Sequence, residues 1–283
     1  MKVVIPAAGL GTRLLPATKA QPKEMLPVVD KPAIQYVVEE ALDSGIRDIL
    51  IITGRGKRAI EDHFDKSVEL EYILEKSGKS EELSEIRRIS DMGNIFYIRQ
   101  KEQLGLGHAV LCAKEHINDE PFAVMLGDDL IVNDKPCIRQ LLDVFEKKKT
   151  SVIAVEQVPQ EKVHKYGIIK EKQIEENLYE IEDIIEKPSK EEAPSNIATI
   201  GRYVFTPGIF ECLENTGPGV GGEIQLTDAI KGLLSSEKVY AYKFSGSRYD
   251  IGSKLDWIKA TVELSIKKSD MKDSLTEFLK EIM

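Results

Sequence analysis

Two glycines and two cations near the start of the chain are the first residues whose types could do chemistry together. Residues 2–6 read as a short apolar strand, which runs directly into a loop containing Gly9, Gly11 and Arg13, and Lys23 follows. Glycines lack a Cβ atom, so their backbone N–H groups can approach a polyphosphate closely. Arg13 and Lys23 supply mobile positive charge. The pattern therefore predicts a loop that binds a nucleotide.

Two better-known phosphate loops fit this stretch poorly. A Walker loop needs Gly-Lys-Ser/Thr after its glycines, whereas residues 11–13 read Gly-Thr-Arg. A dinucleotide loop needs a third glycine, but residues 14–15 are leucines, and Pro16 and Pro22 discourage a long helix directly behind the loop. Asp30 lies roughly where a ribose-binding acid would fall, so a dinucleotide site stays the weaker alternative.

Carboxylates follow two other extended segments. Asp128 and Asp129 come directly after the apolar run at 122–126, and Asp250 stands between an extended segment and a helix start. Each acid taken alone fits a turn or a helix cap. Mg²⁺, however, commonly uses one or two carboxylates together with phosphate oxygens of a substrate. If the fold brings Asp128 and Asp250 together, they form a magnesium site.

Further polar residues suit a sugar phosphate and a base. Glu186 can grip vicinal sugar hydroxyls while the adjacent Lys187 binds a phosphate, although an exposed ion-paired turn explains the pair equally well. Gln100 offers a donor and an acceptor that complement the polar edge of uracil. Gly105 lets a flat base lie against the backbone. His108 is interpreted as a helix-start residue rather than a catalyst.

Charge and cysteine content limit the class of protein. Lys and Arg number 39 against 48 Asp and Glu, a formal net charge of −9, which argues against broad binding to nucleic acid or to anionic membranes. Three widely spaced cysteines indicate neither a disulfide framework nor a zinc site. Residues 2–6 are too short for a signal-peptide core, and no apolar run reaches about 18 residues. We expect a cytoplasmic protein.

The elements that must position these residues alternate along the first half of the chain. Short β-branched runs predict strands at 2–6, 48–53, 94–99, 122–126 and 151–155. Helical patterns lie between them, from Pro32 to Gly45, at 107–116 and at 135–149. This alternation predicts a doubly wound, Rossmann-like α/β fold with a mostly parallel mixed sheet and its ligand crevice at the carboxyl ends of strands.

The remaining segments predict additions to that sheet. Residues 57–92 are charge-rich, which favours a pair of solvated helices covering one edge. Extended segments at 166–170, 178–186 and 198–205 indicate a smaller lobe of mixed sheet that closes over the crevice. The tail at 254–283 has a helical pattern. No repeat or clear interdomain linker is evident, so we expect a single domain.

Together these motifs resemble the UTP–glucose-1-phosphate uridylyltransferases, or UDP-glucose pyrophosphorylases, of bacterial and archaeal type. The resemblance runs from Lys2 to about Leu264. The matching stretches outside the uridylyl-specific ones lie at residues 7–13, 15–19, 126–129, 186–188 and 250–254. The Lys-Glu-Met at 23–25, the Gly-His at 107–108 and the Gly-Glu-Ile-Gln at 222–225 point more narrowly to the uridylyl branch.

The resemblance implies a role for each candidate residue, and Gly11 joins them through the loop argument above. The uridine would be held by Ala8, Gly9, Glu24, Gln100 and Gly105. The sugar would face Gly167, Glu186 and Gly201. Magnesium would be held by Asp128 and Asp250. Catalysis would rest on three cations: Arg13 and Lys23 at the triphosphate, and Lys187 at the sugar phosphate.

The resemblance also implies a reaction, in which the phosphate of glucose 1-phosphate attacks the α-phosphorus of UTP in line and gives UDP-glucose and pyrophosphate. It implies Mg²⁺ as cofactor and a homo-oligomer, dimer or tetramer, without a nucleic acid or membrane partner. Within the single domain, residues 1–160 would mainly bind the nucleotide, 161–253 the sugar phosphate, and 254–283 would form C-terminal helices. A thymidylyltransferase or another sugar-1-phosphate nucleotidyltransferase stays an alternative, as does a non-catalytic sugar-nucleotide sensor.

Overall fold

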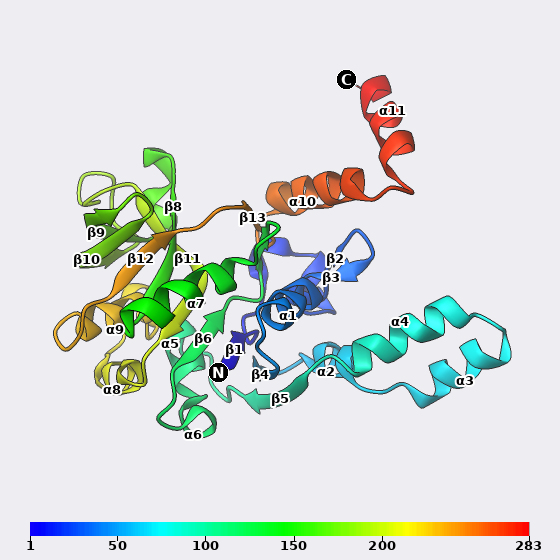
Figure 1. Cartoon of the computed structure of the whole chain (residues 1–283), viewed down its shortest axis with the longest axis horizontal. Helices are drawn as coiled ribbons and strands as arrows, with labels where there is room; N and C mark the ends of the chain where they lie inside the picture. Colours follow the sequence, from blue (N-terminus) through cyan, green and yellow to red (C-terminus); the bar gives the residue numbers. More distant parts are fainter. Residues whose placement is uncertain (283) are drawn as a thin grey trace.

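The computed structural model describes residues 1–282, through which one nine-stranded mixed sheet runs in the order β5-β4-β1-β6-β11-β8-β12-β10-β9 (Figure 1). Its strands are β1 (Lys2–Pro6), β4 (Asp48–Thr53), β5 (Asn94–Arg99), β6 (Phe122–Met125), β8 (Val152–Gln157), β9 (Gly167–Glu175), β10 (Leu178–Glu186), β11 (Ile197–Phe205) and β12 (Tyr240–Lys243). Two small sheets pair β2 (Pro27–Val28) with β3 (Lys31–Pro32), and β7 (Asp129–Val132) with β13 (Ser247–Asp250).

Helices cover both faces of the large sheet. They are α1 (Ala33–Asp43), α2 (Arg58–Phe64), α3 (Val68–Lys76), α4 (Ser80–Ser90), α5 (Leu106–Leu111), α6 (Lys114–Ile117), α7 (Cys137–Lys148), α8 (Gly208–Asn215), α9 (Leu226–Leu233), α10 (Lys254–Lys267) and α11 (Lys272–Ile282). Val3 and Ile5 of β1 share a core with α1 and α7, whereas Val4 shares one with α5, α8 and α9. Successive strand residues point to opposite faces. The predicted doubly wound α/β fold is confirmed.

The first strands run parallel and end at one edge. β1 pairs in parallel with β4 and β6, and β4 with β5, so the loop after Pro6 and the turn after Met125 emerge side by side. The expected strands at 2–6, 48–53 and 94–99 have those same bounds. Backbone direction alone therefore brings the glycine loop next to Asp128.

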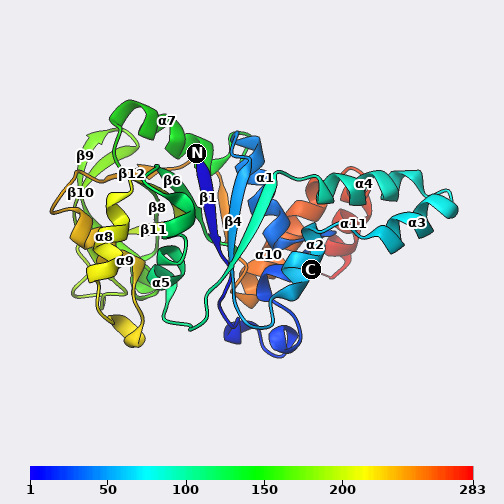
Figure 2. The ribbon, with the colours of Figure 1, turned by 90° about the horizontal axis from the view of Figure 1, so that it is seen from below.

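The region at 57–92 differs from the expected pair of edge-covering helices. It forms three helices, of which α2 packs Ile60 and Phe64 into the core. α3 and α4 pair with each other and extend beyond the sheet (Figures 1 and 2). Val68, Tyr72 and other apolar side chains of α3 remain exposed. The charge-rich segment at 57–92 therefore contains a protruding helical hairpin, formed by α3 and α4.

The smaller lobe has no sheet of its own, which corrects the expected arrangement. β11 pairs with β6 on one side and with β8 on the other, and β12, β10 and β9 continue the same sheet. With nine mostly apolar residues, β11 is long enough to pair with strands from both halves of the sheet.

The tail is helical, as predicted for the described residues, and Met283 lies outside them. α10 crosses the small sheets, where the Trp257 Nε1 donates to the Pro27 carbonyl at 2.9 Å. α11 turns away from α10 and contains no buried residue (Figure 1). Among residues 1–282, no helix combines the length and apolarity that crossing a membrane requires.

Candidate active site

A cavity of about 920 Å³ opens at the carboxyl ends of β1 and β6 and extends toward β9, β10 and β11. All the site residues predicted from the sequence line it, although they come from segments far apart in the chain: Ala8, Gly9, Gly11, Arg13, Lys23, Glu24, Gln100, Gly105, Asp128, Gly167, Glu186, Lys187, Gly201 and Asp250. The nucleotide-half and sugar-half candidates thus share one space.

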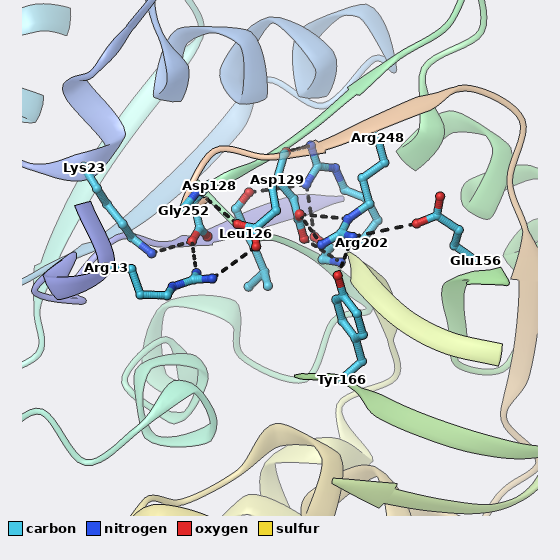
Figure 3. A network of polar contacts seen from close by, with 12 residues as sticks. Arg13, Lys23, Leu126, Asp128, Asp129, Glu156, Tyr166, Arg202, Arg248 and Gly252 are labelled. Carbon is cyan, nitrogen blue, oxygen red and sulfur yellow. Dashed lines mark hydrogen bonds and ion pairs between the residues drawn. The ribbon is translucent and has the colours of Figure 1, made fainter. Parts of the chain in front are cut away.

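Two cations and two acids of the cavity lining meet, and Figure 3 labels three of them, Arg13, Lys23 and Asp128. Lys23 Nζ donates to Asp128 Oδ2 at 2.5 Å, and Arg13 Nη1 donates to Asp250 Oδ2 at 3.1 Å. Arg13 Nη2 also lies 3.7 Å from Asp128 Oδ2. A side chain at Gly252 would clash with the Arg13 guanidinium, so this glycine leaves room for it. One guanidinium thereby links the two predicted metal ligands.

Charge pairing shifts the pKa values of this cluster in opposite directions. Burial alone would raise the pKa of Asp128, but the charge and hydrogen bond of Lys23 lower it overall. The pKa of Lys23 is raised, because Asp128 and Glu24 outweigh the effect of burial. Burial and the neighbouring Asp129 raise the pKa of Asp250. Each shift of Lys23 and Asp128 favours the charged form that the pair needs.

The donor set at the cluster suits a divalent cation. Both acids contact the same guanidinium, which shows that a positive charge fits between their carboxylates. Oxygen ligands from one or two carboxylates, completed by substrate phosphates, are what Mg²⁺ prefers. Among residues 1–282, no cluster of three or more His, Cys, Asp or Glu could hold a metal without a substrate. The arrangement fits a metal that is shared with a phosphate-bearing ligand.

The predicted base-binding residues are organised by internal hydrogen bonds. The Gln100 amide nitrogen donates to the Gly105 carbonyl at 3.2 Å and lies 2.9 Å from His108 Nδ1. Its amide donors are therefore engaged within the chain, and its carbonyl is left to accept from a base. This narrows the expected donor-and-acceptor role of Gln100. His108 acts here as the neighbour that orients Gln100.

Gly105 must be glycine for two reasons. Its φ is +102°, a region that other residues rarely adopt. A Cβ there would also lie 2.7 Å from Glu223 Cβ and 2.8 Å from the Ile224 carbonyl oxygen. The segment at 222–225 packs on this wall, where the Ile224 carbonyl accepts the Gly107 N–H at 2.8 Å. Two of the three stretches that point to the uridylyl branch, residues 107–108 and 222–225, are thus in contact.

Glu24 is buried deeper than a simple ligand-binding residue. Only 1% of its side chain is exposed, and its Oε2 accepts from Lys57 Nζ at 2.7 Å. Burial raises its pKa despite the charges of Lys57 and Lys23. Its other oxygen, Oε1, has no hydrogen-bond partner among the described residues. Glu24 therefore lines the cavity as a largely buried side chain that keeps one acceptor oxygen without a partner among the described residues.

The sugar-side candidates form a second group across the cavity. Gly167 and Glu186 pair across β9 and β10, and Glu186 Oε2 accepts from Thr227 Oγ1 at 2.7 Å. Lys187 Nζ lies 3.0 Å from Glu186 Oε1. Lys187 has a φ of +48°, an unfavourable conformation for a residue with a side chain. Its N–H donates to the Tyr166 carbonyl at 2.9 Å, which helps to hold it there.

Four charged residues around the cavity were not predicted from the sequence: Lys57, Arg248, Arg202 and Glu40. Lys57 pairs with Glu24, and Arg248 pairs with Asp129 at 2.7 Å. Arg202 is fully buried and pairs with Glu40. A signal existed for Arg202, because it interrupts the apolar strand at 197–205. A charge in such a strand requires a buried partner.

Comparisons with known proteins match this architecture over nearly the whole chain. The nucleotidyl transferase family profile matches residues 2–266. A UTP–glucose-1-phosphate uridylyltransferase of Bacillus subtilis (strain 168), YngB, is 57% identical over 282 residues, covering 100% of this chain and 95% of that protein. Another protein of that name, from Staphylococcus saprophyticus, is 54% identical and covers 99% of this chain and 97% of its own.

Solved structures give the same result. A UDP-glucose pyrophosphorylase complexed with UDP-glucose is 46% identical, with a TM-score of 0.87 over 94% of this chain and 99% of the other. A UTP-bound enzyme of the same kind from Acinetobacter baumannii is 40% identical, with a TM-score of 0.92 over 100% and 99%. A putative glucose-1-phosphate thymidylyltransferase from Bacillus anthracis, 24% identical with a TM-score of 0.71, shares the fold.

Proposed function

The chain belongs to the nucleotidyl transferase family, and from that premise we propose that it transfers the uridylyl group of UTP to glucose 1-phosphate, giving UDP-glucose and pyrophosphate. The observation that carries the proposal is the shared cavity, in which phosphate-binding cations, metal-binding acids and a sugar-side Glu-Lys pair face one another. Relatives named for this activity are 54–57% identical over almost the full chain.

The proposed roles follow the two halves of the cavity. The nucleotide is held by Ala8, Gly9, Gly11, Glu24, Gln100 and Gly105. Gly167, Glu186 and Gly201 face the glucose. We propose that the chain forms a single domain. Within it, residues 1–160 mainly bind the nucleotide, residues 161–253 bind the sugar phosphate, and the helices from residue 254 onward complete the fold.

Catalysis needs no general base, because the phosphate of glucose 1-phosphate already carries negative charge at neutral pH. Lys187 orients this nucleophile, while Arg13 and Lys23 neutralise the triphosphate and the departing pyrophosphate. A divalent cation suits Asp128 and Asp250, and we propose Mg²⁺, which when bound would neutralise charge between the phosphates. Arg13 and Lys23, now paired with those acids, would then be free to turn to phosphate oxygens.

Assembly and location complete the proposal, which is a cytoplasmic homo-oligomer. Support for assembly comes from α11, whose Phe278 and Ile282 are 54% and 63% exposed on a helix with no buried residue. An isolated helix of this length is marginal in water, so a second copy that covers it would stabilise it. Light scattering of the full chain and of a chain ending at Lys268 tests this. Equal masses for the two would contradict a role for α11.

Pyrophosphate release measured with glucose 1-phosphate and each of UTP, dTTP, CTP and ATP tests the reaction. Gln100 suits the edge shared by uracil and thymine, and the 5-methyl group of thymine is worth about 1–3 kcal/mol, so we expect UTP to be preferred by roughly 10- to 200-fold. CTP and ATP should give almost no product, because the polar edges of cytosine and adenine would leave buried polar groups of the pocket without hydrogen-bond partners. A preference for dTTP would place the chain in the thymidylyl branch, and no release with any nucleotide would favour a sensor.

A further inference from the structure

Arg248 lines the cavity beside the proposed metal ligand Asp250, and the proposed reaction gives it no role. The two residues are separated by one position on β13, so their side chains point to the same face. Asp250 lies directly opposite Asp129 of β7. Arg248 Nη2 and Nε contact Asp129 Oδ1 at 2.7 and 2.9 Å (Figure 3). Only 10% of the Arg248 side chain is exposed.

The second oxygen of Asp129 reaches the sugar side of the cavity. Asp129 Oδ2 accepts the Gly201 N–H at 3.2 Å. Gly201 lies where the pairing of β11 with β8 shifts register, between Thr199 and Tyr203, so its N–H needs a partner outside the ladder. A Cβ at Gly201 would lie 2.6 Å from Asp129 Oδ2. By holding Asp129, Arg248 fixes the backbone of a residue that we assign to the sugar.

Arg248 also reaches the residue assigned to the sugar phosphate. Its guanidinium lies over the Tyr166 ring, 5.3 Å from the centroid, and Nη1 is 3.4 Å from the Tyr166 hydroxyl. Tyr166 directly precedes Gly167, and its carbonyl accepts the Lys187 N–H. Lys187 has an unfavourable positive φ, so it depends on such contacts to stay in place.

We propose that Arg248 is a positioning residue that holds the sugar-phosphate side of the cavity in register with the metal-binding strand. It acts through Asp129 on Gly201 and through Tyr166 on Lys187, while its own strand carries Asp250. The inference rests on the proposed function. Both contacts use the planar fork of arginine, which binds a carboxylate through two N–H groups and stacks its flat face on an aromatic ring. A lysine ammonium can lie over a ring, but it has neither the paired N–H groups nor the planar face, so it cannot make both contacts at once.

The test is Arg248→Lys, which keeps the charge and loses the fork. A misplacement of about 1 Å at a reacting group costs up to roughly 100-fold. We expect kcat/KM for glucose 1-phosphate to fall by about 10- to 100-fold, whereas the KM and the directly measured Kd of UTP change by less than about threefold. Arg139→Lys is the matched control, because Arg139 also donates to a carboxylate, that of Asp143, and does not line the cavity. It should behave like the wild type.

Tyr166 variants examine one contact separately. Tyr166→Leu removes the ring and should reproduce the loss for glucose 1-phosphate, whereas Tyr166→Phe keeps the ring and should cost less. This pair also carries the test if Arg248→Lys fails to fold. Equal losses for both substrates, or no loss in Arg248→Lys and Tyr166→Leu, would overturn the positioning role. An inactive wild type would overturn the proposed function and this inference with it.

Discussion

Two groups of charges meet on the turn at 126–129 and are built in opposite ways. Arg202 is fully buried, and its guanidinium donates to both Glu40 oxygens and to the carbonyls of Leu126, Gly201 and Asp129. At the cavity, the Arg13 side chain is 63% exposed, and its ion-pair partners among residues 1–282 are Asp128 and Asp250. The Arg202 guanidinium is hydrogen-bonded to backbone carbonyls, whereas the Arg13 guanidinium is paired with carboxylates that a ligand could also bind.

The difference suggests two kinds of role: Arg202 keeps structural elements in place, whereas Arg13 and Lys23 are able to exchange their partners. Arg202, in the middle of β11, links the end of β6 and the start of β7 to α1, so Asp128 and Asp129 are held in a fixed frame. Arg13 and Lys23 pair with Asp128 and Asp250. In the proposed function, phosphates and a cation would replace these partners. Substitutions in the first group should therefore cost stability, and those in the second should cost turnover.

The largest effect is expected from Arg202→Met. Removing one partner leaves Glu40 buried without its counter-ion, and breaking a buried ion pair costs about 3–5 kcal/mol of the free energy of unfolding. Chemical denaturation followed by circular dichroism measures it. Arg13→Gln is the comparison, because an exposed pair is worth about 0–1 kcal/mol. If both variants lose the same free energy, the two groups do not differ as described.

Asp128→Asn and Asp250→Asn should each lower turnover at least about 100-fold and leave the fold intact, because a neutral amide is a poor magnesium ligand. Pyrophosphate release over a range of Mg²⁺ concentrations gives the rate, and circular dichroism gives the fold. Asp119→Asn, at an exposed acid outside the cavity, serves as control. Near-normal rates at limiting Mg²⁺ would reject the assignment of both acids.

Lys187→Ala should separate the two substrates. We expect roughly a tenfold or greater rise in the KM of glucose 1-phosphate, from the loss of a charge-assisted contact to its phosphate, with UTP binding nearly unchanged. Lys190→Ala, at a neighbouring exposed lysine, controls for net charge. A loss confined to UTP would move Lys187 to the other substrate.

The smallest effect tests the exchange directly. Without nucleotide, Arg13→Gln removes a competitor for Asp128 and Asp250, so a free divalent cation should bind more tightly. An exposed pair is worth at most about 1 kcal/mol, which corresponds to roughly fivefold. Titration with Mn²⁺, followed by water-proton relaxation, measures this affinity. Weaker binding to the variant would show that Arg13 does not occupy the metal position.

Much of the fold follows from local pattern. The strands at 2–6, 48–53 and 94–99 are continuous β-branched runs bounded by turns, and their bounds match the structure. The glycine loop and Asp128 could be predicted because they follow strands closely, whereas Gly167 and Gly201, which lie within strands, came from the family resemblance. The long-range partners could not, because nothing local states that Arg202 meets Glu40 or that Arg248 meets Asp129. Nor does local pattern show that β11 joins two halves of one sheet.

The single sheet also determines how specificity in such an enzyme can change. β11 is hydrogen-bonded to β6 on one side and to β8 on the other. The proposed pockets for base and sugar are therefore built on one continuous sheet rather than on two exchangeable modules. Exchanging one half with a homologue would cut through this ladder and its buried bonds. We expect a change of substrate to require changes in the loops at the cavity rim instead, such as the glycine-rich turn before α9, where Gly221 and Gly222 have φ of +73° and +75°.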